Sequence, residues 1–379
     1  MERAEQQSPG ARAAPSFVAS LRRMFRAAIV PVVAVLIALA IGAVIIAISG
    51  ANPLEAYAAL LRGGLGNARA IGRTLEKATP LIFGGLAVTL AFKGGLFNIG
   101  AQGQLLFGAI VAAYVGFAVQ GLPAIVHIPL ALLAGAWMGA LWAAIPGALK
   151  AYTGAHEVIT TIMLNFVAIN MTDYLADGPW KDTSPGNIVA RTPAVADSAV
   201  LPDIGSIPLG IVIAVAVAAL VWWLIGRSTL GFDLRTVGQN PSAALYAGMS
   251  VRRVTIVAMV ASGFLAGLGG AIESLGVVGR FQPGFNAGLG FTAITVALLA
   301  RTNPLGVIPA ALLIGAMQAG ASRMQFDSGV SPEIIDVVQA LILFFVAADM
   351  IIRWLIRVRA TDTERVTLSS GWVSSKKAG

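Results

Sequence analysis

The sequence is divided into apolar runs that are each about as long as a bilayer is thick. The first run, Ala27–Ile48, has no charged residue in 22 positions and follows Arg22, Arg23 and Arg26. Such a run can cross a hydrocarbon core about 30 Å thick as a helix. It is longer than the apolar part of a signal peptide and ends without a clear cleavage site, which predicts a retained first helix.

The overall composition agrees with a membrane protein. Hydrophobic residues make up 57% of the 379 residues and charged residues 12%, whereas soluble domains carry about 25% charged residues. We therefore expect an all-α fold, a polytopic transmembrane helical bundle of about ten spans. The expected spans are 27–48, 74–92, a third that begins near Gly94, 124–149, 158–175, 207–225, 254–277, 288–300, 305–321 and 334–352.

Basic residues predict which side of the membrane each connection faces. With these spans, eighteen Lys and Arg residues fall on the side of the N-terminus and eight on the other side. Because positive charge concentrates on the cytoplasmic side, both termini are expected there. The net charge of +8 is then a result of topology, and no nucleic-acid partner is expected. The expected parts are a cytoplasmic N-terminal tail (1–26), a first transmembrane half (27–226) with an outer loop (176–206), a cytoplasmic central loop (227–253), a second transmembrane half (254–352) and a cytoplasmic tail (353–379).

The central loop contains the signals of one short helix. Asn240 can cap a helix that begins at Pro241 and that Gly248 can end after about two turns. Small side chains that would let another protein approach closely are at Ala243, Ala244 and Ala247. The local residues leave two interpretations open, a docking helix for a partner or an ordinary capped turn in a large loop.

Several polar residues lie in or near apolar helices. Because such groups are costly in a bilayer unless they pair or line a cavity, they are candidates for a substrate pathway. The alternative is hydrogen bonding between helices. The candidates are Asn98, Gln102, Gln104, Glu157, Asn165, Glu273 and Asn286.

A weak internal repeat is visible across the central loop. Phe97–Asn98 opens the third span, and Phe285–Asn286 stands just before the eighth. The third span would run outward and the eighth inward. This predicts that spans 2–5 and 7–10 are inverted repeats, an arrangement in which substrate sites lie between broken helices. The GxxxG spacings 135–139 and 263–267 are expected to serve helix packing.

Known catalytic motifs are missing from the sequence. It contains no GxxxxGK[ST] phosphate loop, no HExxH, no GxSxG and no cysteine, and its two histidines are far apart. We therefore expect neither an ATPase site nor a metal or other cofactor in this chain, and expect no enzyme activity. Active transport would then draw energy from an ion gradient or from a partner, and the central loop favours the partner.

Four segments resemble one family. They are FNIGAQGQLLFGA at 97–109, EVITTIMLNF at 157–166, GQNPSAALYAGMSVRR at 238–253 and SGFLAGLGGAIE at 262–273. In this order they resemble the permease subunits of bacterial ABC importers, in the group for simple sugars and nucleosides, over about residues 70–352. The segment DGPWKDTSPGN at 177–187 is similar to that of the longer nucleoside permeases.

The resemblance implies a division of labour among several proteins. A periplasmic or lipid-anchored binding protein delivers a small-molecule substrate, two permease subunits form the path in the inner membrane among its lipids, and cytoplasmic ATPase subunits bind ATP and Mg. The helix at 240–248 would be the coupling helix, and the polar candidates would line the path. Gln102 departs from the family pattern, in which a carboxylate is expected.

The resemblance implies nucleosides as the substrate, with simple sugars as the alternative. Amides and acids can hydrogen-bond the hydroxyls of both, so the candidate residues do not distinguish them. A second alternative is an ion-coupled transporter that uses Glu157 and Glu273 as proton sites.

Overall fold

The computed structural model describes residues 17–348 except 206 and 286, and the side chains from residue 29 onward. In this part the chain is almost entirely helical, apart from one hairpin of two-residue strands between α6 and α7. The elements are α1 (Phe17–Ile48), α2 (Pro53–Leu65), α3 (Ala68–Lys93), α4 (Ala101–Ala118), α5 (Ala124–Thr153), α6 (Glu157–Asp177), β1 (Asp203–Ile204), β2 (Ile207–Pro208), α7 (Leu209–Arg227), α8 (Thr229–Gln239), α9 (Pro241–Tyr246), α10 (Val251–Glu273), α11 (Leu289–Leu299), α12 (Pro304–Ser328) and α13 (Glu333–Ala347).

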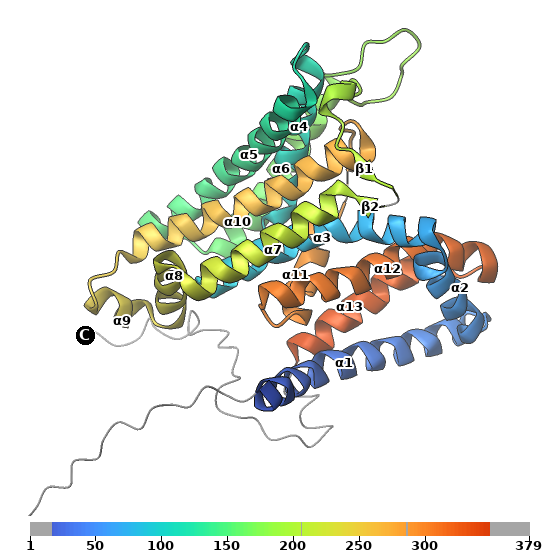
Figure 1. Cartoon of the computed structure of the whole chain (residues 1–379), viewed down its shortest axis with the longest axis horizontal. Coiled ribbons are helices and arrows are strands. Elements are labelled where there is room, and N and C mark those ends of the chain that lie inside the picture. The colour runs from blue at the N-terminus through green and yellow to red at the C-terminus, as the bar shows by residue number, and fades with distance from the viewer. Residues whose placement is uncertain (1–16, 206, 286, 349–379) are drawn as a thin grey trace, which may run out of the picture.

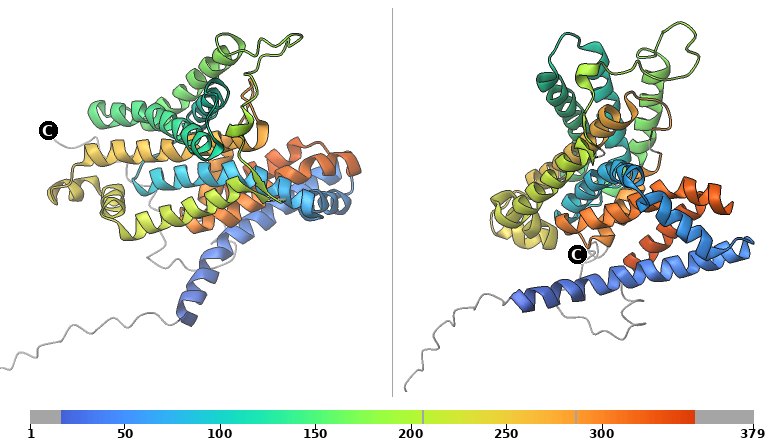
Figure 2. Two further views of the ribbon diagram at one scale, coloured as in Figure 1. Left: turned by 45° about the horizontal axis from the view of Figure 1, so that its top comes forward. Right: turned by 45° about the vertical axis from the view of Figure 1, so that its right-hand side comes forward.

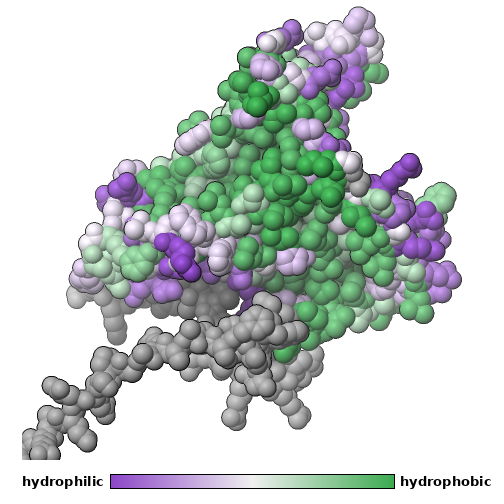
Figure 3. All heavy atoms as spheres, in the orientation of Figure 1, coloured by the Kyte–Doolittle hydropathy of each residue, from purple (hydrophilic) through white to green (hydrophobic). Residues whose placement is uncertain are grey.

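The long helices form one bundle with two distinct ends. Figure 1 shows α8 and α9 at one end, which we call the α9 end, and α2 at the opposite end, which we call the α2 end. Figure 2 shows α1 at the edge of the bundle. On the face drawn in Figure 3, a broad hydrophobic surface covers the middle, and hydrophilic residues gather toward the ends. This distribution is the one that a bilayer imposes.

Eight helices of the described part are long and apolar enough to cross a membrane. They agree with the expected spans 1 to 7 and 9. The expected eighth span is instead the 11-residue helix α11, about 16 Å long at 1.5 Å per residue, roughly half of the thickness of the hydrocarbon core. The expected tenth span is described as the 15 residues of α13, because residues from 349 onward lie outside the described part.

Two connections contain helices that the sequence analysis missed. The connection between the first two expected spans, 27–48 and 74–92, contains α2 and the first turns of α3. The central loop contains two helices, because α8 precedes the expected α9. Both missed helices are short, since α2 has 13 residues and α8 has 11, too few to span a bilayer.

An Asn–Pro pair begins three of the helices. Asn52, Asn240 and Asn303 are each followed by a proline, and each side-chain oxygen accepts a hydrogen bond from a backbone N–H in the first turn of α2, α9 or α12. Proline fits there because its missing N–H would have had no partner within the helix. The predicted start of α9 at Asn240 and Pro241 is therefore confirmed.

Glycines allow the central helices to touch through their backbones. A Cβ atom added at Gly108 of α4 would lie 2.2 Å from the carbonyl oxygen of Gly267 on α10. One added at Gly139 of α5 would lie 2.5 Å from the carbonyl oxygen of Gly263. The packing role expected for the GxxxG spacings is thus confirmed, and α10 lies in close contact with both α4 and α5.

The helix contacts agree with the expected inverted repeat, in which α3, α4, α5 and α6 correspond to α10, α11, α12 and α13. Under this correspondence, the α5–α10 contact matches α12–α3, and α4–α10 matches α11–α3. All four pairs are in contact, as are the matching pairs α4–α6 and α11–α13. The helices α4 and α11 therefore occupy equivalent positions in the two halves.

We predict that Gly108→Leu strongly destabilises the bundle. The new side chain would meet backbone atoms of α10, which cannot move aside, and overpacking of this kind costs about 1–3 kcal/mol or more. The measurement is thermal unfolding of the purified protein in detergent. Gly226→Leu is the matched control, because nothing lies within 4 Å of a Cβ at Gly226. Equal melting temperatures for the two variants would contradict this packing.

Candidate site at the broken helices

A buried amide network lies at the connection between α3 and α4. The Asn98 Nδ2 donates to Gln104 Oε1 at 2.9 Å and to Ser262 Oγ at 2.8 Å, and Ser262 Oγ donates to the Ala87 carbonyl at 2.7 Å. Gln104 Nε2 returns a bond to Asn98 Oδ1 at 3.0 Å. Asn98 and Gln104 are each 1% exposed. The network therefore ties α3, α4 and α10 together where the chain is not helical.

Side chains from neighbouring helices cap the starts of both α4 and α11. Asn165 of α6 accepts from Gly103 N at 2.9 Å and donates to Ile99 O at 2.9 Å, at the start of α4. Gln102 of α4 accepts from Gly290 N at 2.7 Å, at the start of α11. The first N–H groups of a helix have no partner within the helix. In a bilayer they must find one in the protein, and these two amides provide it.

The starts of α4 and α11 also touch directly. A Cβ atom added at Gly290 would lie 2.5 Å from the backbone nitrogen of Gln102. Gln102 and Gly290 stand at equivalent positions of the repeat, each five residues after the phenylalanine of the Phe–Asn pair. The positive ends of two helix dipoles therefore meet between the halves. The region where α4 and α11 meet is therefore polar, and the amide side chains that line it carry no formal charge.

Glu157 lies apart from this network. Its Oε2 is 2.8 Å from the Lys150 Nζ, and it begins α6 just after the end of α5. It is separated from Asn165 by eight residues of α6, or about 12 Å. The structure thus places this candidate in an ion pair at the α9 end.

Glu273 lies near the α2 end. It is 2% exposed and is the last residue of α10, directly before a π-helix at Ser274–Val278 that the sequence analysis did not predict. With Glu76 and Asp203 it lines a cavity of about 10 Å³, the size of a single water molecule. Glu273 is separated from Ser262 of the amide network by eleven residues of α10, or about 16 Å. Asn286 lies outside the described residues.

The helix α9 has the predicted cap and the predicted end. Asn240 Oδ1 accepts from Ala243 N at 3.0 Å. At the other end Met249 N donates to the Ala244 carbonyl at 3.0 Å, while Gly248 has a φ of 80°. This is the Schellman arrangement, in which glycine adopts a left-handed conformation that closes the helix.

The exposed surface of α9 differs from the expected one. Ala243 and Ala247 are exposed, but Ala244 is completely buried within the chain. A partner could not reach Ala244, so the expectation that all three alanines form one exposed face is corrected. The prominent side chains are instead Tyr246, 94% exposed, and Leu245, 65% exposed. Burial of one helix face was not visible in the sequence because α8 was not predicted.

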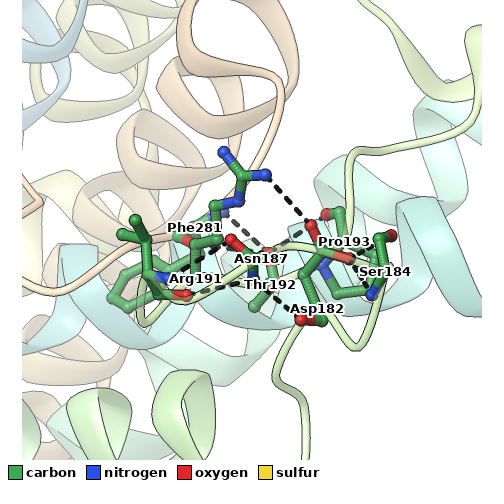
Figure 4. Close-up of polar contacts among 8 residues, drawn as sticks. Asp182, Ser184, Asn187, Arg191, Thr192, Pro193 and Phe281 are labelled. Carbon is green, nitrogen blue, oxygen red and sulfur yellow. Dashed lines mark hydrogen bonds and ion pairs between the residues drawn. The ribbon is translucent and has the colours of Figure 1, made fainter.

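The loop between α6 and β1, which we expect on the outer side and call the outer loop, is attached to the connection between α10 and α11 (Figure 4). Thr192 N donates to the Phe281 carbonyl at 2.9 Å, and Phe281 N donates to Thr192 Oγ1 at 2.9 Å. Nearby, the hydrogen bond from the Ser184 hydroxyl, with help from the Ser184 N–H and from Arg191, lowers the pKa of Asp182 below its usual value. Asp182 and Arg191 form an ion pair at 3.3 Å.

Further along, two more backbone bonds hold this loop. Val195 N donates to the Gly279 carbonyl at 2.9 Å, and Leu201 N donates to the Leu275 carbonyl at 3.0 Å. The chain from 192 to 201 therefore follows the end of α10 and its π-helix. If the end of α10 moves, these hydrogen bonds require the loop from 192 to 201 to move with it.

These features define a class of protein, a polytopic helical membrane protein in which the starts of two helices, α4 and α11, meet inside the bundle. The family model described as branched-chain amino acid transport system / permease component matches residues 70–347. The chain belongs to this family, and it is a multi-pass membrane protein. The resemblance seen in the four sequence segments is thereby confirmed.

Curated relatives cover most of the chain. The guanosine ABC transporter permease protein NupP of Bacillus subtilis is 42% identical over 86% of this chain and 94% of its own length. The nucleoside ABC transporter permease protein NupB of Lactococcus lactis is 36% identical over 91% and 98%. The glucose ABC transporter permease protein TsgB13 of Haloferax volcanii is 37% identical over 83% and 86%. No solved structure matches the chain.

We predict that Asn165→Ala lowers the stability of the bundle by about 1–3 kcal/mol, because it leaves the buried Gly103 N–H without a partner. Asn170→Ala is the matched control on the same helix, since Asn170 is exposed and donates only to the Phe166 carbonyl of its own helix. Thermal unfolding in detergent measures both variants. A control as unstable as Asn165→Ala would refute the capping role.

Proposed function

We propose that the chain is the permease subunit of an ATP-driven ABC importer of nucleosides. The observation that carries this proposal is the similarity to two nucleoside permeases over nearly their whole length, 94% and 98%. It includes the segment of α8 and α9 that would contact an ATPase. The chain itself has no phosphate loop, so ATP and Mg would be bound by that partner.

The chemistry of the amide network supports a neutral, polar substrate. Its members, Asn98, Gln102, Gln104 and Asn165, offer both donors and acceptors, as ribose hydroxyls and base edges require. In the described conformation these amides bond to one another and to the backbone. A passing substrate would form hydrogen bonds with the amides in place of some that they make with one another. This replacement limits the free-energy cost of breaking the network. Glu157 and Glu273 remain proposed path residues outside this network, and Asn286, which is not among the described residues, remains a proposed path residue as well.

A simple sugar is the second candidate substrate, because one relative of comparable identity is a glucose permease. The two candidates share hydroxyl groups and differ in the nucleobase. The amide network suits both, so the substrate must be decided by measurement.

The second permease subunit is proposed to be a different chain. Three organisms each contain two relatives with a shared name, one closer to this chain and one more distant. The pairs are NupP at 42% and NupQ at 27%, NupB at 36% and NupC at 26%, and TsgB13 at 37% and TsgC13 at 27%. This chain corresponds to the closer member of each pair, so a partner of the other type would complete a heterodimer.

In the proposed assembly the α9 end faces the cytoplasm of a bacterial cell, as do both termini. The ATPase contacts α9, and a periplasmic or lipid-anchored binding protein approaches the α2 end of the inner-membrane complex. The tip of the outer loop is available there, since Ile188 is 91% exposed. The chain contributes the path and no catalytic step.

The first test is uptake of labelled guanosine and labelled glucose into proteoliposomes that contain the chain, its second permease, the ATPase and the binding protein. We expect ATP-dependent guanosine uptake that disappears when any one component is omitted. Uptake of glucose alone would replace the nucleoside assignment by the sugar assignment. Uptake by the single chain under a proton gradient would overturn the ABC assignment in favour of ion coupling.

A second test concerns the exposed surface of α9. We expect Tyr246→Asp to reduce ATP-dependent uptake at least tenfold and to weaken copurification of the ATPase, because a charge would replace an aromatic contact at the interface. Tyr152→Asp is the control, since Tyr152 is 68% exposed in the last turn of α5 and lies outside α9. Full uptake by Tyr246→Asp would remove α9 from the proposed contact.

A further inference from the structure

The helix α8 touches the break between α3 and α4 through backbone atoms at Gly238. A Cβ atom added at Gly238 of α8 would lie 2.2 Å from the Lys93 carbonyl oxygen and 2.8 Å from Gly95 N. One added at Gly95 would lie 2.9 Å from the Gly238 Cα. Two glycines therefore face each other, with no side chain between the two segments. Because closely packed backbone segments compress little, a displacement of α8 would be passed on to the connection between α3 and α4.

The remainder of α8 is fixed just as closely. Leu234 is 1% exposed, and its Cδ2 lies 3.4 Å from the position of a Cβ at Gly94. At the other end of the helix, a Cβ at Gly231 would lie 2.2 Å from the Leu224 carbonyl of α7. The helix α8 is thus held between α7 and the break.

A single residue joins α8 to α9. Asn240 N donates to the Thr236 carbonyl at 3.0 Å and so ends α8, while its side chain caps the start of α9. No flexible linker separates the two helices. A force applied to α9 therefore reaches Gly238, two residues away from Asn240, through a rigid corner.

On the other side of the contact, a short path leads to the amide network. Gly95 has a φ of 73°, which favours glycine, and Asn98 follows three residues later. Asn98 accepts from Gly100 N at 3.0 Å and binds Gln104 and Ser262. The start of α4 is therefore within a few residues of the α8 contact.

We infer that the contact of Gly238 with Lys93–Gly95 is the joint through which movement of α9 reaches the start of α4 and its amide network. The inference rests on the proposed function, since it assigns the positioning residues that link the ATPase contact to the path. Gly238 and Gly95 act through the backbone they hold and touch no substrate. The α8 helix, and not the α9 surface alone, is then required for coupling.

Gly238→Ala tests the joint in the complete reconstituted complex. The added methyl group meets the Lys93 carbonyl and forces the two segments apart. We expect the complex to assemble and to hydrolyse ATP within about twofold of the wild type, but guanosine uptake per ATP hydrolysed to fall at least tenfold. Gly226→Ala is the matched control, because the space around it on α7 is open. Unchanged uptake per ATP in Gly238→Ala would overturn the inference.

A second variant decides the question if Gly238→Ala fails to assemble. Leu234→Ala loosens the same joint by removing atoms and adds none. We expect its uptake per ATP to fall at least threefold, while Phe232→Ala, which alters a side chain 54% exposed on the same helix, keeps the wild-type ratio. A wild-type ratio in Leu234→Ala would also overturn the inference.

The two hypotheses fail in different ways. If the wild-type complex shows no ATP-dependent uptake of guanosine or glucose, the proposed function is wrong. If the wild-type complex transports and the joint variants transport equally well, only the joint is wrong. The ratio of uptake to hydrolysis separates a coupling defect from a general loss of folded protein, which lowers both rates together.

Discussion

The interior of this protein depends on one constraint, that backbone N–H and C=O groups inside a bilayer must be satisfied by the protein itself. Unbroken helices meet it without help, but α4 and α11 begin inside the bundle and leave N–H groups without helical partners. Asn165 and Gln102 supply those partners. The broken helices therefore require these buried amides. Hydrogen bonding between helices and a place on a substrate pathway, the two roles considered for the amides, are compatible.

The same architecture gives each broken connection a contact with a segment outside the two repeats. The connection at 94–100 is held by α8 through Gly238. The connection after α10 is held by the outer loop through Thr192 and Val195. Because the repeat is inverted, the two contacts lie at opposite ends of the bundle, and the starts of α4 and α11 meet between them at Gln102 and Gly290. Each end of the molecule thus has a short structural route to the centre.

Much of this could be predicted from the sequence, where local chemistry alone determines the structure. The apolar runs predicted the long helices because bilayer thickness fixes their length, and Asn240 with Gly248 predicted both ends of α9. The helices α2 and α8 were missed because they are too short to span a bilayer, so bilayer thickness gave no signal for them. Because α8 was missed, the burial of Ala244 was not predicted either.

The candidate site was predicted in part. The segment 97–104 indicated its amides, because polar residues are rare in such surroundings, but sequence spacing could not show that Asn98 pairs with Ser262, 164 residues away. Nor could it separate Glu157 and Glu273 from the network, because both also stand in apolar helices. Their distance from the amides follows from where the helices begin and end, which depends on tertiary contacts.

The distribution of charge sets a limit on what can pass through the centre. Formal charges among the candidate residues lie toward the ends, with Glu157 paired to Lys150 at one and Glu273 near the other. Between them stand neutral amides and helix N-termini. An ion that entered this region would lose its hydration shell. The four amides would offer it dipoles but no opposite charge, so its transfer from water would be unfavourable. A neutral molecule loses less and regains hydrogen bonds. The amide at Gln102, in place of a carboxylate, extends this neutral region to the point where α4 and α11 meet.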